Sequence, residues 1–258
     1  MNESPNIVLC YPVEQYHIDV IQAAWPEANI INAGQEKVAE ALFEADIFCG
    51  HAKVPVDWDG VVRQGRIRWI QSSAAGMDHC LVPSVIASDI HVTSASGVLA
   101  DQVAEHTIAL LTGWTRSLPV FFEAKHKREF IRRPTRDLTR STVGIIGFGG
   151  VGRRLAEILR TFKVRMHAVD LIPEDKPEYV ESLSGPAHMG WLMSQCDFVV
   201  LCLPLNAETR GIIDRKMLER MKPTAMLANM ARGPLVDTDA LVDCLREGRF
   251  AGAVMDVT

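Results

Sequence analysis

Short apolar runs along the chain alternate with longer stretches whose apolar residues recur at helical spacing. In the first hundred residues this pattern predicts strands at 7–10, 29–31, 47–49, 68–71 and 92–94. It predicts helices between them, at 13–24 and 36–44. Such βαβ alternation is typical of a parallel sheet with helices on both faces.

The same alternation resumes after residue 140. Apolar runs predict five further parallel strands, which start near Val143 and Met166 and continue at 197–203, 225–229 and 253–257. Helices are predicted at 100–114, 153–161, 214–220 and 239–247. We therefore expect an α/β fold with two doubly wound parallel-sheet domains, 1–98 and 99–258, which meet where a small-residue stretch precedes the long helix.

The stretch TVGIIGFGGVG, residues 142–152, joins one buried strand to a helix and spaces its glycines G-x-G-x-x-G. Gly147 permits the tight turn, Gly149 lets the backbone approach a pyrophosphate, and Gly152 lets helix and strand pack closely. The helix N-terminus offers N–H groups and partial positive charge to phosphates. The next strand ends on Asp170, 18 residues after Gly152. This context makes the second domain a Rossmann dinucleotide-binding domain.

Asp170 also indicates which dinucleotide binds. Its carboxylate can accept hydrogen bonds from the adenosine ribose hydroxyls and would repel a 2′-phosphate. Leu171 and Ile172, which follow it, supply no cation. The sequence therefore favours NAD over NADP.

Composition excludes several other classes of protein. The 258 residues carry a formal net charge of −5, and no apolar run is long enough to span a bilayer, so neither a nucleic-acid nor a membrane partner is indicated. The N-terminus has no signal-peptide pattern. The six cysteines are scattered, so we expect reduced thiols in a cytoplasmic protein and no metal site. The basic segment 125–140 is either a patch that binds an anion or nucleic acid or, as we favour, a solvated face or subunit-contact arm.

Six stretches together resemble the D-isomer-specific 2-hydroxyacid dehydrogenases, NAD-dependent two-domain enzymes that include glyoxylate/hydroxypyruvate reductases and phosphoglycerate dehydrogenases. The resemblance extends over nearly the whole sequence given. The stretches that carry it are RWIQSSAAGMD (68–78), VAEHTIALL (103–111), VGIIGFGGVG (143–152), LCLPLNAETRGIID (201–214), MKPTAMLANMARGPLVDTDALVDCL (221–245) and AGAVMDV (251–257).

The resemblance implies an oxidoreductase that transfers a hydride between NAD(H) and a small 2-oxo or D-2-hydroxy acid. It implies that backbone N–H groups at Ala75 and Gly76 hold the substrate carboxylate. Arg232, in the N-x-x-R-G motif, binds the 2-oxo acid and polarises its carbonyl, because negative charge builds on that oxygen during hydride attack. The implied cofactor contacts are Gly147, Gly149, Gly150, Val151, Gly152, Asp170, Leu203, Pro204, Thr209, Ala231 and Asp256.

The family's acid/base histidine and its partner glutamate lie after the Asp256 position, and the sequence given stops at Thr258. We therefore expect a C-terminally truncated chain, in which the first domain lacks its returning segment and the second is incomplete. His106 matches a family position for which a structural role is expected. His51, at a strand end, is a weaker candidate for ligand contact. The resemblance also implies a homodimer formed through residues 100–140.

Two other functions stay open. A dinucleotide-binding module without catalysis, similar to the family's transcriptional corepressors, would bind NAD(H) without turnover. A dehydrogenase for formate or phosphite would differ only in its substrate. Neither the substrate side chain nor the preferred reaction direction follows from the sequence.

Overall fold

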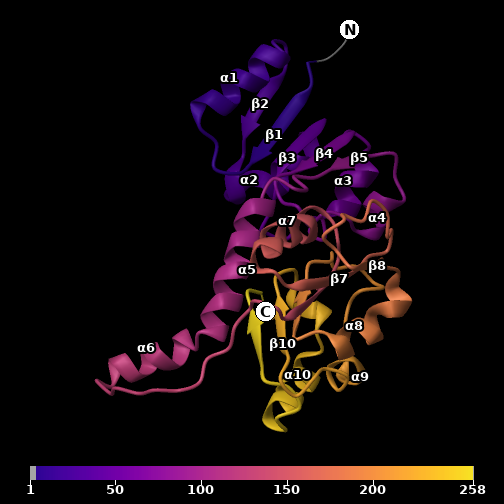
Figure 1. Cartoon of the computed structure of the whole chain (residues 1–258). Coiled ribbons are helices and arrows are strands. Elements are labelled where there is room, and N and C mark those ends of the chain that lie inside the picture. The colour runs from indigo at the N-terminus through magenta and orange to yellow at the C-terminus, as the bar shows by residue number, and fades with distance from the viewer. Residues whose placement is uncertain (1–3, 258) are drawn as a thin grey trace. The chain divides into compact units, whose positions relative to one another are not determined.

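The computed structural model describes residues 4–257 and divides the chain into two compact units, Met1–Val98 and Leu99–Thr258. Figure 1 shows the elements of each unit. Each unit is a sheet of parallel strands with helices interleaved along the chain. The α/β fold class predicted from the sequence is confirmed.

Unit 1 contains a five-stranded sheet in the order β2-β1-β3-β4-β5. Its strands are β1 (Asn6–Cys10), β2 (Asn29–Asn32), β3 (Ile47–Gly50), β4 (Trp69–Ser72) and β5 (His91–Thr93). Its helices are α1 (Gln15–Ala24), α2 (Gly34–Ala41), η1 (Leu42–Glu44), α3 (Trp58–Gln64) and α4 (Pro83–Ile86).

Alternate residues of the unit 1 strands belong to two hydrophobic clusters, one on each face of the sheet. Ile7 and Leu9 of β1 pack with Ile21 of α1, whereas Val8 packs with Val38 of α2 and Val61 of α3. Side chains on a strand point alternately to the two faces, so a run that is apolar throughout is stable only between two layers of helices.

Unit 2 contains a six-stranded sheet in the order β11-β10-β9-β6-β7-β8. Its strands are β6 (Thr142–Ile146), β7 (Arg165–Val169), β8 (Ser182–Ser184), β9 (Phe198–Leu201), β10 (Met226–Asn229) and β11 (Gly252–Met255). Its helices are α5 (Ala100–Thr115), α6 (Leu118–His126), α7 (Gly150–Leu159), η2 (Arg160–Phe162), η3 (Pro186–His188), α8 (Met189–Gln195), α9 (Arg215–Leu218), η4 (Gly233–Leu235) and α10 (Thr238–Arg246).

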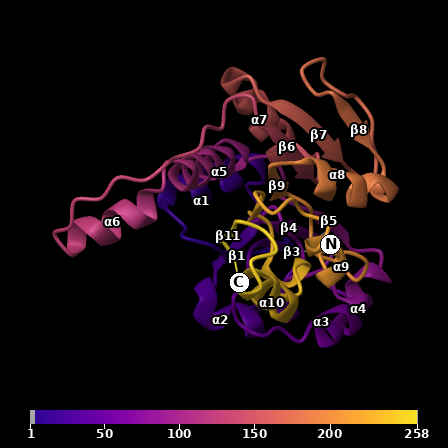
Figure 2. The same cartoon turned by 60° about the horizontal axis from the view of Figure 1, so that its bottom comes forward.

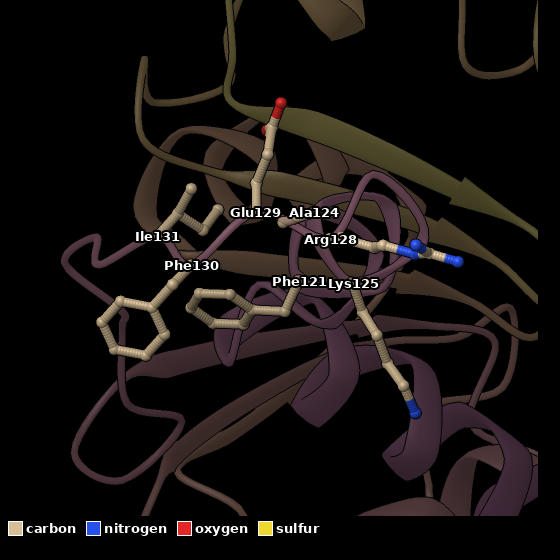
Figure 3. Close-up of a pocket in the computed structure, with 7 residues that line it drawn as sticks. All are labelled: Phe121, Ala124, Lys125, Arg128, Glu129, Phe130 and Ile131. Atoms are coloured by element: carbon tan, nitrogen blue, oxygen red, sulfur yellow. The ribbon is translucent and has the colours of Figure 1, made fainter.

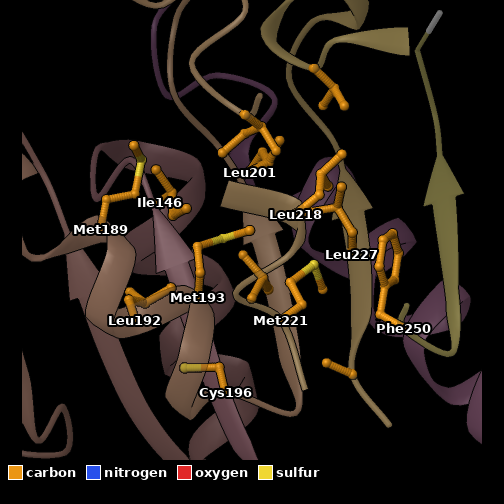
Figure 4. Packing of buried hydrophobic residues seen from close by; sticks show 14 of the residues in the cluster. Ile146, Met189, Leu192, Met193, Cys196, Leu201, Leu218, Met221, Leu227 and Phe250 are labelled. Carbon is orange, nitrogen blue, oxygen red and sulfur yellow. The ribbon is translucent and has the colours of Figure 1, made fainter. Parts of the chain in front are cut away.

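Two clusters sandwich this second sheet. One packs α8, α9 and α10 against one face through residues such as Ile146, Leu201 and Leu227, and Figure 4 shows these side chains interlocking. The other packs α5 and α7 against the opposite face through Ile145 and Val200, with their neighbours. Each helix layer therefore buries one set of alternate strand residues.

The structure corrects several predicted elements of unit 2. The sheet has a sixth strand, β8, where five were predicted, because Ser-Leu-Ser is too short and polar to stand out as an apolar run. Helix α9 covers only Arg215–Leu218, fewer residues than the predicted 214–220. The basic segment 125–140 begins inside α6, which extends with its returning segment away from the sheet in both overall views (Figures 1 and 2).

Within residues 4–257, the structure contains no helix long and apolar enough to cross a membrane. All six cysteines are free thiols. Burial raises the pKa of Cys49 and Cys80 to about 11 and that of Cys196 and Cys202 to about 12. These four thiols are therefore protonated near neutral pH, which disfavours a nucleophilic role.

Candidate active site

The glycine turn of unit 2 leaves the carboxyl end of β6 and enters α7. Gly147 has φ +92°, and a Cβ there would lie 2.5 Å from the backbone nitrogen of Leu203. A Cβ at Gly152 would overlap the carbonyl oxygen of Gly147. At Gly149, in contrast, a Cβ would meet nothing within 4 Å. Backbone atoms thus fill the space beside Gly147 and Gly152, whereas the space beside Gly149 is open and lets a ligand approach the backbone.

Helix α7 begins at Gly150, three residues before the predicted start, so Gly150, Val151 and Gly152 form its first turn. No side chain caps this end of the ten-residue helix. The first N–H groups of a helix have no partner within the helix, and the helix dipole adds partial positive charge there. This end of α7 therefore fits an anionic group such as a pyrophosphate.

Asp170 follows β7 and ties that strand to the glycine turn. Its Oδ2 accepts a hydrogen bond from the backbone N–H of Phe148 at 2.5 Å, and its Oδ1 accepts one from that of Ile172 at 3.0 Å. Each carboxylate oxygen can accept a further hydrogen bond, so the side chain keeps capacity for ribose hydroxyls. Leu171 and Ile172 are exposed, and neither brings a cation to this position.

The loop after β9 carries three of the proposed cofactor contacts. The backbone of Leu203 lies against Gly147, and the N–H of Cys202 donates to Ile146 O at 2.7 Å. The Thr209 hydroxyl donates to Pro204 O at 2.8 Å and accepts from the N–H of Asn206 at 2.8 Å. Thr209 thus closes this loop, a structural role that the sequence motif did not reveal.

Arg232 lies just after β10, between the strand and η4. Its Nη1 donates to Ala231 O at 2.8 Å, and its carbonyl accepts from the Asn229 side chain at 2.7 Å. These contacts bring the guanidinium to the carboxyl edge of the sheet, the edge that also carries the glycine turn. Ligands of open parallel sheets bind at this edge.

Asp256 follows β11 and lies beside the end of β10, because its N–H donates to Asn229 O at 3.1 Å. Its Oδ1 lies 3.1 Å from Nε2 of His106 on α5. Both side chains are about half exposed. The sequence predicted neither this pairing nor any contact for His106, since no local spacing relates residues 150 positions apart.

In unit 1, Ala75 and Gly76 lie in the loop that leaves β4. The buried hydroxyl of Ser72 accepts from the N–H of Ala74 at 3.1 Å and donates to Ala74 O at 3.1 Å. The N–H of Ala95 also donates to Ala74 O, at 3.1 Å. The loop is therefore held in one conformation directly before its two proposed substrate contacts.

Two histidines lie beside this loop. His79 Nε2 is 3.4 Å from the Ser72 hydroxyl, and the rings of His51 and His79 stack with their centroids 4.0 Å apart. The sequence predicted only that His51 follows a strand end. The stacking of His51 on His79, whose ring approaches Ser72, is a finding of the structure.

The structure thus gathers at one sheet edge of unit 2 the predicted glycine turn, Asp170, the 203–209 loop, Ala231, Arg232 and Asp256. Ala75 and Gly76 belong to the sheet edge of unit 1. In the part of the chain that the structure describes, no group of three or more His, Cys, Asp or Glu side chains could hold a metal ion. The residues in unit 2 fit a dinucleotide, because an open glycine backbone, an uncapped helix end and a carboxylate at the next strand are combined.

Comparison with known proteins agrees with this geometry. A family model described as "D-isomer specific 2-hydroxyacid dehydrogenase, NAD binding domain" matches residues 108–258. A glyoxylate reductase from Thermococcus gammatolerans is 30% identical to the chain, with an alignment that covers 98% of this chain and 79% of that protein.

Two solved structures show the same arrangement of elements. A glyoxylate reductase from Paecilomyes thermophila superposes with a TM-score of 0.84 at 25% identity and covers 100% of this chain and 82% of that one. A D-isomer specific 2-hydroxyacid dehydrogenase from Xanthobacter autotrophicus, solved with NADPH and MES, gives a TM-score of 0.80 at 27% identity, covering 98% and 81%.

Proposed function

Because the chain belongs to the D-isomer specific 2-hydroxyacid dehydrogenase family, we propose that it is an oxidoreductase that moves a hydride between NAD(H) and a small 2-oxo or D-2-hydroxy acid. The observation that carries the proposal is the glycine turn, open at Gly149 and held to the next strand by Asp170. Arg232 at the same sheet edge adds a cation suited to an anionic substrate.

The residues of the turn and of the neighbouring strand ends would hold the dinucleotide. Gly147, Gly149 and the first turn of α7, with Gly150, Val151 and Gly152, would bind the pyrophosphate through backbone N–H groups. Asp170 would bind the adenosine ribose and favour NAD over NADP. Bound NAD(H) supplies the hydride chemistry, which no amino-acid side chain provides. The other proposed cofactor contacts are Leu203, Pro204, Thr209, Ala231 and Asp256.

Arg232 would bind the substrate anion and stabilise the negative charge that develops on the carbonyl oxygen. A guanidinium stays charged throughout the physiological pH range and can donate two parallel hydrogen bonds to a carboxylate. In unit 1, the N–H groups of Ala75 and Gly76 would bind the substrate carboxylate. The resemblance places the family's acid/base histidine in a motif that residues 4–257 do not contain. We therefore assign the transfer of a proton to the carbonyl oxygen to no side chain among these residues.

We also propose that the chain forms a homodimer through residues 100–140. On and after α6 the side chains of Phe122 and Phe130 are 66% and 86% exposed. Phe121 and Phe130 lie beside Ile131 and Lys125 around a hollow of about 430 Å³, shown in Figure 3. A cluster of exposed aromatic side chains supports contact with another protein surface. The six free thiols support a reducing compartment such as the cytoplasm.

Titration with NADH and an assay of 2-oxo acid reduction test the proposed activity. The chain should bind NADH, followed through nicotinamide fluorescence, and the 2-oxo acids glyoxylate, hydroxypyruvate and pyruvate should be compared with formate and phosphite. Arg232→Gln should keep its NADH affinity and lose about tenfold or more in 2-oxo acid affinity, since one charged hydrogen-bonding group contributes about 1.5–3 kcal/mol. Equal 2-oxo acid binding by this variant and by wild type would contradict the role of Arg232.

Turnover separates the proposed enzyme from the two other candidates. NADH binding without reduction of any compound of the panel would favour the dinucleotide-binding module. Reaction with formate or phosphite alone would favour a dehydrogenase of another substrate class. No NADH binding at all would overturn the proposal.

A further inference from the structure

One buried polar side chain in unit 2 has no place in the function proposed above. Asn229 is the last residue of β10, and its exposed fraction is 0%. Its strand is paired on both sides, with β9 through Leu201 and with β11 through Met255. A buried amide is costly unless its donor and acceptor are satisfied, so its hydrogen bonds show what keeps it there.

Both ends of the Asn229 amide bind the segment that carries Arg232. Its Oδ1 accepts from the N–H of Ala231 at 3.1 Å, and its Nδ2 donates to Arg232 O at 2.7 Å. Its main-chain oxygen accepts from the N–H of Asp256 at 3.1 Å. One residue thus contacts three positions that the proposed function assigns to the cofactor and the substrate.

The Arg232 guanidinium binds the same short segment. Its Nη1 donates to Ala231 O at 2.8 Å, and the N–H of Ala231 is held by Asn229. The Arg232 carbonyl, held by Nδ2, also accepts from the N–H of Leu235 at 3.3 Å and so joins η4. The Ala231 N–H and the Arg232 carbonyl, which lie on either side of the peptide group between these two residues, are thereby both held by a single amide.

We propose that Asn229 is a positioning residue, which orients the Arg232 guanidinium toward the substrate by holding the Ala231 N–H and the Arg232 carbonyl. The inference rests on the proposed function, because it takes Arg232 to be the group that binds the 2-oxo acid. An amide suits this task because it donates at one end and accepts at the other. An aliphatic side chain of similar size would leave a buried N–H and a buried carbonyl without their partner.

Hydrogen exchange without ligand tests the structural half of the proposal. Asn229→Ala should speed amide exchange at Ala231 by about tenfold or more, because the N–H loses its acceptor. Asn229→Ser should restore part of the protection, since a serine hydroxyl can accept from the N–H two residues on. As a matched control, Thr107→Val removes a different buried hydrogen bond of unit 2, from Oγ1 to Val103 O at 2.7 Å. Unchanged protection at Ala231 in Asn229→Ala would overturn the proposal.

Binding of oxamate, an unreactive mimic of a 2-oxo acid, tests the functional half. With saturating NADH, Asn229→Ala should bind oxamate about tenfold more weakly than wild type, with Asn229→Ser between them and the NADH affinity changed less than about threefold. Thr107→Val should bind like wild type. Equal losses in Asn229→Ala and Thr107→Val would show a general loss of stability and overturn the proposal. The proposal would also be overturned if Asn229→Ala bound oxamate like wild type while Arg232→Gln bound it more weakly.

Failure of the proposed function gives a different pattern. If Arg232→Gln binds oxamate as well as wild type does, the proposed role of Arg232 in substrate binding is wrong. The positioning role proposed for Asn229 is then wrong as well. The exchange rate at Ala231 then reports separately whether the amide orders the loop.

Discussion

Adding one methyl group to the glycine turn should have opposite consequences at two positions three residues apart. At Gly149 a Cβ would meet nothing within 4 Å, and the backbone there, with φ −78° and ψ −156°, is accessible to alanine. At Gly152 a Cβ would overlap the carbonyl oxygen of Gly147 and lie 3.3 Å from Cγ2 of Ile145. We therefore expect Gly149→Ala to affect the ligand and Gly152→Ala to affect the fold.

The expected magnitudes follow from these contacts. Overpacking costs about 1–3 kcal/mol, and because the atom that a Cβ at Gly152 would overlap belongs to the backbone, we expect the upper part of this range, about 2–3 kcal/mol. The gain in helix propensity from glycine to alanine offsets about 1 kcal/mol, so a net loss of about 1–2 kcal/mol is expected. Gly149→Ala adds no contact in the free protein and should change the unfolding free energy by less than about 0.5 kcal/mol. Its methyl group would occupy the space of the pyrophosphate, so NADH affinity should fall about tenfold or more, because hydrogen bonds to a charged group contribute about 1.5–3 kcal/mol.

Urea unfolding and NADH titration of both variants measure these effects. Gly113→Ala in α5 is the control, because a Cβ at Gly113 makes only an ordinary contact, 3.6 Å from Leu118 Cδ1, and the neighbouring Trp114 packs on Phe198, at the opposite end of β9 from the turn. It should not lower stability and should leave the NADH affinity unchanged. The reasoning is refuted if Gly149→Ala binds NADH like wild type, or if Gly152→Ala unfolds at the wild-type urea midpoint.

Three further substitutions test other parts of the structure. Asp170→Ala should weaken NADH binding about tenfold and reduce the ratio of NADH affinity to NADPH affinity, which parallel titrations measure. An unchanged ratio would contradict the role of Asp170. The Asp197 carboxylate accepts from Lys222 Nζ at 2.9 Å and from the Thr142 N–H at 2.8 Å, and although burial raises its pKa, these bonds lower it overall. Asp197→Asn should therefore lower the free energy of unfolding by about 1 kcal/mol at pH 7. This difference from wild type should shrink as the pH falls below about 3.9, the pKa of an aspartate in the unfolded chain, and vanish below the lowered pKa of the folded protein. Urea unfolding from pH 7 to pH 2 measures it, and a difference that stays constant with pH would contradict the role of the carboxylate. Phe122→Ser combined with Phe130→Ser should convert a dimer to monomer in sedimentation velocity, whereas Ile86→Ser, at an equally exposed apolar residue of α4, should not.

The strands that form the centre of each sheet were predictable because they are buried on both faces. Runs such as Val143–Ile146 and 198–203 contain no polar side chain, which is typical of a strand that is buried on both faces. Strand β8 escaped prediction because an edge strand of three half-buried residues carries no such run. Helix α7 was predicted to start at Arg153 because glycine disfavours helices, yet close packing of Gly152 against Gly147 outweighs that propensity.

The proposed site was predictable where its residues follow strands, and only there. Strand ends of a parallel sheet meet at one edge, so Gly147, Asp170 and Arg232 could be assigned together from the sequence. Contacts between side chains of distant elements could not. The pairing of His106 with Asp256 and the stacking of His51 on His79 depend on the packing of helices and loops, which no spacing in the sequence encodes.

The strand order of unit 2 has a consequence for how the protein is made. The first strand of the sheet to leave the ribosome, β6, lies in the interior of the finished sheet, with β7 and β8 on one side and β9, β10 and β11 on the other. Residues 142–184 therefore contain the glycine turn, Asp170 and both backbone N–H groups that its carboxylate binds. Within unit 2, the residue proposed for the substrate, Arg232, and the other proposed cofactor contacts come entirely from the segments that begin at β9. During synthesis the protein should thus acquire the adenosine half of its site first, and NAD-dependent protection from proteolysis in nascent chains halted after residue 184 had emerged would reveal that order.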